Sequence, residues 1–91
     1  MWGILLKKLN IKYINIPSEL VFDKNIPALA KIIYGQIKVL SHKNGVCKVT
    51  NNYFAECNNC SQRTIGRMLK ILYKNNYILI EDGVHRKITI L

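Results

Sequence analysis

Residues 50–74 limit the folds open to this chain more than any other stretch, because their apolar residues recur with the period of a helix. Four of them follow the spacing i, i+3, i+4 and i+7: Ile65, Met68, Leu69 and Leu72. This spacing places them on one stripe and predicts a helix over Gln62–Lys74 with one buried face. Ser61 can start that helix by accepting a hydrogen bond from a free amide of its first turn.

The residues just before Ser61 predict a tight turn between two helices. A bend this short usually needs one residue with positive φ, and Asn59 is the best candidate that is not glycine. Cys60 then faces inward as a small apolar residue. Upstream, Thr50 can cap a shorter helix whose inner face holds Phe54 and Ala55. Together these elements predict a helix-turn-helix, although an αα-hairpin in a small helical bundle would show the same pattern.

The outer face of the longer helix is basic. At about 100° per residue, four side chains fall within a sector of roughly 60° on the side away from the apolar stripe: Arg63, Arg67, Lys70 and Lys74. The whole chain has 14 Lys and Arg against 5 Asp and Glu, a formal net charge of +9 over 91 residues. Because this charge coincides with the helix-turn-helix, nucleic acid is favoured over an anionic membrane as the binding partner. The alternative is that the charge serves only solubility.

The length and hydropathy of the chain predict one domain that does not enter a membrane. A chain of 91 residues suffices for a single modest core. No apolar run approaches the ~20 residues that span a bilayer. The apolar residues 1–6 are cut off by Lys7 and Lys8, unlike the hydrophobic middle of a signal peptide. We therefore expect a cytoplasmic protein.

The segment before residue 50 predicts an N-terminal extension, a first helix and a short strand. Residues 1–17 read as helix or coil followed by a strand over 11–16, and they either pack on the domain or exchange with a second copy. A helix should run from about Asn25, its candidate cap, to Leu40, with Gly35 where another element approaches closely. Lys31 and Lys38 should face water. Its core stripe is Leu29, Ile33, Ile37 and Leu40, widened by Ile26, Ala30 and Ile32. Residues 41–45 read as a loop and 46–49 as a strand.

The residues after the longer helix predict a hairpin over residues 77–91. Asn75 and Asn76 are suitable stop residues for the helix. The strands cover 77–81 and 86–91, and Asp82-Gly83 is a hairpin signal. We favour a four-residue loop over a two-residue one because it sets Leu79 opposite Ile88 and Glu81 opposite Arg86. Either loop would keep four residues on one face: Tyr77, Leu79, Ile88 and Ile90.

Five short stretches resemble the winged helix-turn-helix family of plasmid and phage replication initiators and small mobile-element regulators. They are Tyr13-Ile14-Asn15-Ile16-Pro17, Ala30-Lys31-Ile32-Ile33-Tyr34-Gly35, Phe54-Ala55-Glu56, Ser61-Gln62-Arg63-Thr64-Ile65 and Asn76-Tyr77-Ile78. The resemblance spans nearly the whole chain and implies an α+β winged helix-turn-helix fold: three helices, a short strand and a hairpin wing, plus the N-terminal extension. Asn58 stands where the family usually has an apolar residue, and Asn59 where it has glycine, so a looser turn is expected.

The resemblance also implies binding of double-stranded DNA, with residues 61–67 in the major groove and the wing at an adjacent groove or phosphate run. The DNA-binding residues expected from the helix, its cap and the wing are Thr50, Ser61, Gln62, Arg63, Thr64, Arg67, Lys70, Lys74, His85, Arg86 and Lys87. The resemblance covers only the DNA-binding module of the initiators, which favours a small regulator of transcription or replication. We expect it to act as a homodimer, because one winged helix reads only a few base pairs. The alternatives are an anti-CRISPR-like phage inhibitor of a host nucleic-acid enzyme, such as an RNA-guided nuclease, and a module that only dimerises or recruits.

The sequence offers little that would support catalysis or a cofactor. Its five carboxylates are scattered, its two histidines fall in loops, and no glycine-rich phosphate loop is present, so we expect no enzyme activity. Cys57 and Cys60 form a C-x-x-C pair that could make a zinc site with Cys47 and His42. We favour three reduced thiols without metal, because Cys60 is expected to face inward and a single C-x-x-C is a weak signal.

Overall fold

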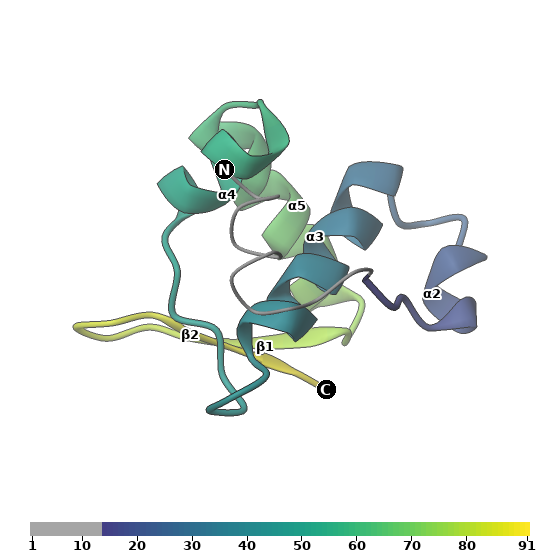
Figure 1. The fold of residues 1–91 in the computed structure, drawn as a ribbon. Coiled ribbons are helices and arrows are strands. Elements are labelled where there is room, and N and C mark those ends of the chain that lie inside the picture. Colours follow the sequence, from purple (N-terminus) through teal and green to yellow (C-terminus); the bar gives the residue numbers. More distant parts are fainter. Residues whose placement is uncertain (1–13) are drawn as a thin grey trace.

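The chain folds as a set of helices followed by a two-stranded hairpin (Figure 1). The structure is a computed structural model that describes residues 14–91, so the predictions for residues 1–13 lie outside the described residues. The elements are α2 (Ser18–Val21), α3 (Ala28–Leu40), α4 (Asn51–Asn58), α5 (Gln62–Lys74), β1 (Ile78–Glu81) and β2 (Lys87–Ile90). This arrangement confirms the predicted α+β winged helix-turn-helix, with α4 and α5 as the helix-turn-helix and the hairpin as the wing.

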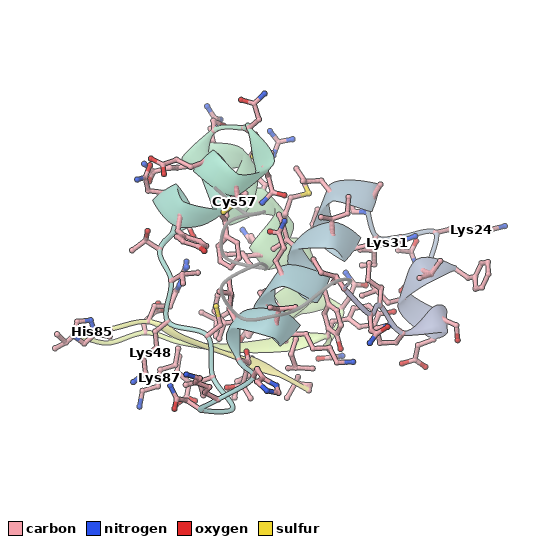
Figure 2. All side chains as sticks on the ribbon, viewed as in Figure 1. Lys24, Lys31, Lys48, Cys57, His85 and Lys87 are labelled. Carbon is pink, nitrogen blue, oxygen red and sulfur yellow. The ribbon has the colours of Figure 1, made fainter. Side chains whose placement is uncertain are left out.

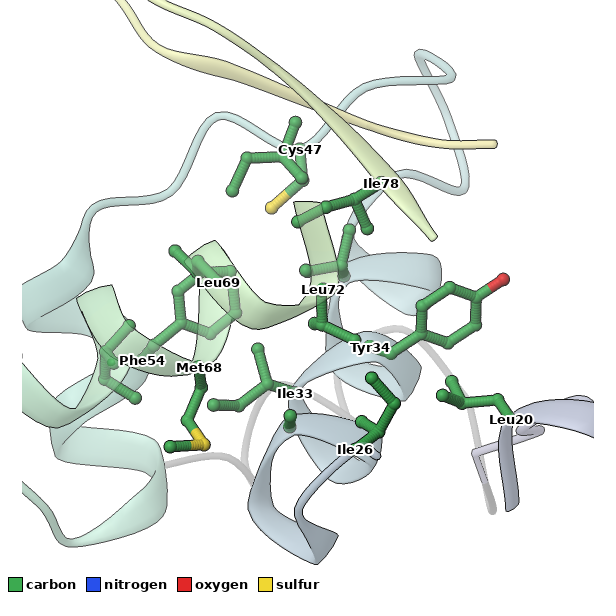
Figure 3. Close-up of a cluster of buried hydrophobic side chains, with 14 of the residues drawn as sticks. Leu20, Ile26, Ile33, Tyr34, Cys47, Phe54, Met68, Leu69, Leu72 and Ile78 are labelled. Atoms are coloured by element: carbon green, nitrogen blue, oxygen red, sulfur yellow. The ribbon is translucent and has the colours of Figure 1, made fainter. Parts of the chain in front are cut away.

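The core lies where α3, α5 and the hairpin meet (Figure 3). All four residues of the predicted α5 stripe are buried: Ile65, Met68, Leu69 and Leu72. They cluster with apolar side chains from the other elements: Ile33, Ile37, Phe54, Ile78 and Ile88. Burying each such side chain contributes roughly 1.5–3 kcal/mol, so this cluster holds α5 with its opposite face toward solvent.

The start of α3 differs from the prediction. Asn25 is not its cap; the Asn25 backbone N–H instead donates to Asp23 Oδ1 at 2.9 Å, which closes a turn before the helix. Pro27 occupies the cap position with an extended backbone, φ −62° and ψ 152°, and makes no side-chain cap bond. Because a residue that precedes proline is driven out of the helical region, Ile26 cannot begin the helix. The end of α3 at Leu40 is as predicted.

The buried face of α3 is wider than its predicted stripe. Ile32 was placed in the core but is 47% exposed, while Tyr34 and Gln36 are buried instead. Lys31 does not simply face water, because its Nζ donates to the Val21 carbonyl at 2.6 Å. The additional buried residues face other elements: Gln36 hydrogen-bonds Asn58 of α4, and the Tyr34 ring packs edge-on against Tyr77, with ring centroids 6.2 Å apart.

Gly35 is the point of closest approach to α3, as predicted. A Cβ added there would come within 2.2 Å of Ile14 Cγ2 and 3.4 Å of Ile16 Cγ1. These two isoleucines belong to the segment predicted as a strand over residues 11–16. Its described part, residues 14–16, is not a strand, because it lies on a helix and no neighbouring strand offers it a ladder.

The strand predicted over residues 46–49 is reduced to one bridge. Cys47 N–H donates to the Ile88 carbonyl at 2.8 Å, and Ile88 N–H donates back to the Cys47 carbonyl at 2.9 Å. Two residues further on, the Val49 carbonyl accepts from the Arg86 side chain at 2.7 Å. We call residues 46–50 the linker.

The hairpin register differs by one residue from the favoured prediction. Ile78 pairs with Ile90, Ile80 with Ile88, and Glu81 with Lys87, which leaves a five-residue loop over 82–86. These four isoleucines now share the face that packs on the core, and Leu79 is 40% exposed on the other face. A one-residue slip moves side chains to the opposite face of a strand, so the predicted apolar face was wrong for Leu79. Tyr77, which precedes β1, is half-buried and packs against the core.

Candidate nucleic-acid interface

Local capping bonds set the orientation of α5 and of the helix before it. Ser61 Oγ accepts from Thr64 N–H at 3.1 Å, and Thr50 Oγ1 accepts from Tyr53 N–H at 3.2 Å, as predicted. Asn59 has φ 53°, the left-handed conformation expected for the turn. Cys60 N–H then donates to the Ala55 carbonyl at 3.0 Å, which closes the end of α4. The turn is therefore held by hydrogen bonds of its own residues.

The solvent face of α5 carries the predicted cations. Arg63, Arg67, Lys70 and Lys74 are all exposed. No Asp or Glu occurs in the thirteen residues of the helix, so no carboxylate on α5 offsets this charge. Two polar residues at the start of α5 are bonded within the protein. Gln62 is exposed, and its Nε2 donates to Asn52 Oδ1 at 3.3 Å. Thr64 is half-buried and shares a 3.0 Å hydrogen bond with the Ser61 hydroxyl. Arg63 and Arg67 are therefore the long side chains available for base contacts near the start of α5.

The wing carries the remaining predicted residues. His85 lies at the free end of the hairpin, and Lys87 lies nearer its base (Figure 2). Both are exposed. Figure 2 also places Lys48 of the linker at this end of the molecule; Lys48 was not among the predicted DNA-binding residues. Nothing in its sequence neighbourhood marks Lys48, because its position beside the wing depends on the Cys47–Ile88 bridge.

Arg86 differs from the other predicted cations because its guanidinium is used within the protein. It is half-buried, with Nη1 donating to Asn51 Oδ1 and Nη2 donating to the Val49 carbonyl at 2.7 Å. Burial lowers the pKa of Arg86, although the group remains a cation. Asn51 in turn lies beside α5, since a Cβ at Gly66 would be 3.7 Å from Asn51 Nδ2. Arg86 thus joins the last residue of the wing loop to the first residue of α4.

A groove runs between α5 and the wing. We call it the helix groove; its volume is about 390 Å³ and its lining includes Lys70, Tyr73, Lys74, Asn51, Asp82 and Arg86. Two of the predicted cations, Lys70 and Lys74, therefore lie between the helix and the hairpin, whereas Arg63 and Arg67 lie nearer the start of α5. Asp82 is a carboxylate in this lining.

The cysteines form no metal-binding group in the described part of the chain. All three are free thiols, and Cys47 is buried in the core while Cys57 and Cys60 are half-buried. Burial raises the pKa of the Cys47 and Cys57 thiols, which disfavours the thiolate form that binds metal. Within residues 14–91, no three side chains of His, Cys, Asp or Glu gather closely enough to hold an ion.

Comparison with known proteins agrees with this geometry. The model of a family described as a helix-turn-helix domain matches residues 24–78, more than half of the chain. The chain belongs to this family. Searches of curated proteins and of solved structures gave no match. The match to the helix-turn-helix domain covers α3, α4 and α5 and stops at the first residue of β1. The family match therefore does not extend over the wing.

Helix-turn-helix domains are DNA-binding modules, typically without catalytic activity, and their second helix is the one that reads the major groove. In this helix-turn-helix domain that helix is α5, whose solvent face holds the four cations described above. Between residues 14 and 91, no helix has the length and apolar character needed to cross a membrane.

Proposed function

We propose that this protein binds double-stranded DNA sequence-specifically and regulates transcription or replication in a phage or other mobile element. The observation that carries the proposal is the two-sided character of α5. Its buried stripe fixes the helix on the core, and its exposed side offers two arginines and two lysines without a carboxylate. A helix of this kind, second in a helix-turn-helix, is suited to enter the major groove.

Arginine is the side chain that gives this proposal its specificity. The chain has three arginines and eleven lysines, and two of the three arginines lie one turn apart on the exposed face of α5. A guanidinium can bond O6 and N7 of guanine together, whereas a lysine acts mainly as a point charge. We assign base contacts to Arg63, a base or adjacent phosphate to Arg67, and phosphate contacts to Lys70 and Lys74.

Selection of duplexes from a random pool, followed by binding isotherms, tests the function. On the selected site, Arg63→Ala should cost about 1–3 kcal/mol and reduce the preference over scrambled DNA. Lys38→Ala is the matched control, because Lys38 is an exposed cation on α3. If Arg63→Ala and Arg67→Ala both leave the affinity for selected and scrambled DNA unchanged, α5 does not read DNA and the proposal fails.

We further propose that the protein acts as a homodimer. A single winged helix reads only a few base pairs, and natural operators are commonly two-fold symmetric. Two copies would place two α5 helices in successive major grooves, about 34–36 Å apart.

One observation favours an inhibitor of a host nucleic-acid enzyme as a second candidate. Val21 and Phe22 are 42% and 78% exposed at the α2 end, which lies on the opposite side of the molecule from the wing tip (Figure 1). An exposed phenylalanine is a common anchor in protein interfaces. Under this alternative, Phe22→Ala would abolish binding to the enzyme while leaving binding to free DNA unchanged; under DNA regulation alone no such enzyme is bound.

A further inference from the structure

A second hollow adjoins the helix groove. We call it the linker hollow; it measures about 280 Å³ and is lined by Lys48, Val49, Thr50, Asn51, Val84, His85 and Arg86. Asn51 and Arg86 line both hollows and form the wall between them. The helix groove faces Lys70 and Lys74 of α5, whereas the linker hollow faces Lys48 and the wing tip. The wing therefore has a basic recess on each side of the Arg86–Asn51 wall.

Three interactions bring the lining of the linker hollow together from distant parts of the chain. The paired hydrogen bonds between Cys47 and Ile88 hold the linker against β2. The bond from Arg86 to the Val49 carbonyl holds the linker against the end of the wing loop. Lys48, between these two points, is exposed, and Figure 2 shows it at the same end of the hairpin as His85. The recess is thus built by the fold: main-chain bonds hold the linker to β2, and the Arg86 side chain holds it to the wing loop.

The chemistry of the linker hollow suits an anion. Its ionisable side chains are Lys48, His85 and Arg86, and no carboxylate lines it. The Thr50 hydroxyl accepts from Tyr53 N–H, so its own proton remains available to donate. At roughly 30 Å³ per water molecule, the volume has room for a phosphate and part of its hydration shell. A neighbouring hollow shares Lys48, Val84 and His85 but is also lined by Glu81 and Asp82, which would repel an anion.

We propose that the linker hollow binds a backbone phosphate of the DNA, with Lys48 as the cation that contacts it and Thr50 and His85 as hydrogen-bond donors. This inference rests on the proposed DNA-binding function and extends it to a residue outside the helix-turn-helix and the wing. DNA would then be contacted on both sides of the wing: through Lys70 and Lys74 in the helix groove and through Lys48 in the linker hollow. Such a contact is independent of base sequence.

The salt dependence of binding to a mixed-sequence duplex tests this proposal. Each phosphate contact contributes about 0.9 to the slope of log affinity against log salt. Lys48→Ala should lower the magnitude of that slope by about one unit. Between about 50 and 200 mM salt, the factor by which the affinity of the wild type falls should therefore be about 3–4 times the factor for the variant. Lys48→Arg should restore the slope. Lys38→Ala, which removes an equal charge from α3, should leave the slope unchanged.

The outcomes separate this inference from the function on which it rests. If the wild type binds no duplex DNA, the proposed function fails and the inference fails with it. If Arg63→Ala weakens binding but Lys48→Ala keeps the wild-type slope, only the linker hollow is refuted. Equal effects of Lys48→Ala and Lys38→Ala would also refute it, because they would reflect net charge alone. Thermal melting of each variant checks that the fold is kept, which is expected since both lysines are exposed.

Discussion

The carboxamides of Gln36 and Asn58 exchange two hydrogen bonds, each 2.8 Å long, and thereby join the middle of α3 to the last residue of α4. Asn58 Nδ2 also donates to the Phe54 carbonyl at 2.8 Å. Gln36 is only 3% exposed, and no buried side-chain nitrogen or oxygen in the described residues lacks a partner. The departure of Asn58 from the family pattern predicted a looser turn before α5. That prediction was wrong, because the Asn58 side chain is held by these hydrogen bonds. It fixes α4 against α3.

The first prediction concerns this amide pair. Gln36→Leu or Asn58→Leu alone should lower the free energy of unfolding by roughly 1–3 kcal/mol, because each leaves a buried amide without its partner. The double variant should lose less than the sum of the two, since it removes both polar groups. Urea unfolding of the four proteins measures the coupling. Asn52→Leu, at an exposed asparagine of the same helix, should change stability little. Strictly additive losses would mean that the two amides are not coupled.

The second prediction concerns a bond between the wing and the turn before α3. Tyr77 O–H donates to Asp23 Oδ2 at 2.7 Å. This bond, followed by that from Asn25 N–H, lowers the pKa of Asp23, and the same carboxylate raises the pKa of Tyr77 to about 12. The Asp23 contribution to stability is therefore complete above the ordinary aspartate pKa of 3.8 and is lost as pH falls through the lowered pKa of Asp23. The Tyr77 contribution is complete below pH 10 and is lost as pH rises toward about 12.

Tyr77→Phe should thus lower the melting temperature near neutral pH, and its difference from the wild type should shrink at both extremes. Melting curves from about pH 3 to pH 12 measure this difference. Tyr73→Phe is the matched control, because Tyr73 is an exposed tyrosine on α5. A Tyr77→Phe difference that stays constant across the whole range would show that the bond to Asp23 does not contribute to stability.

The third prediction is that Arg86 acts by positioning the wing. Arg86→Lys keeps the charge but cannot bond Asn51 and the Val49 carbonyl with one rigid fork. We expect it to lower the free energy of unfolding by roughly 1–3 kcal/mol and to weaken DNA binding nearly as much as Arg86→Ala. Urea unfolding and binding isotherms measure the two effects.

Asn51→Ala provides the partner variant for this test. The double variant Asn51→Ala/Arg86→Ala should lose less free energy of unfolding than the sum of the two single variants, because both substitutions remove the same contact. Lys87→Ala, at the exposed neighbour, should leave stability near that of the wild type. Full rescue of DNA binding by Arg86→Lys would identify Arg86 as a phosphate contact instead.

The fourth prediction concerns the dimer. The first 16 residues are the expected extra contact between copies, so deleting residues 1–10 should weaken self-association more than it lowers the melting temperature. Sedimentation of the full chain and the deletion variant, each with and without DNA, measures the association. A full-length protein that binds a single unsymmetrical site as a monomer would rule out the dimer.

The sequence alone determined those features of the fold whose interacting residues lie within a few positions of one another in the chain. Thr50 and Ser61 cap helices through amides three positions away, and Asn59 closes a turn by adopting φ 53°. The i, i+3, i+4, i+7 stripe of α5 is periodic, so its buried and exposed faces follow from spacing alone. For the same reason the four exposed cations of α5 could be predicted residue by residue.

The tertiary structure decided the features whose partners lie far apart in the chain. Neighbouring hairpin registers differ little in local pairing; the observed one places four isoleucines on the core and frees Arg86 to reach Asn51, 35 positions away. Gln36 and Asn58 are 22 positions apart, and nothing in the local sequence of either one identifies the other as its partner. Lys48 reaches the wing only because Cys47 pairs with Ile88. These contacts depend on the relative placement of whole elements, which is set by burial summed over the core and has no signature in local spacing.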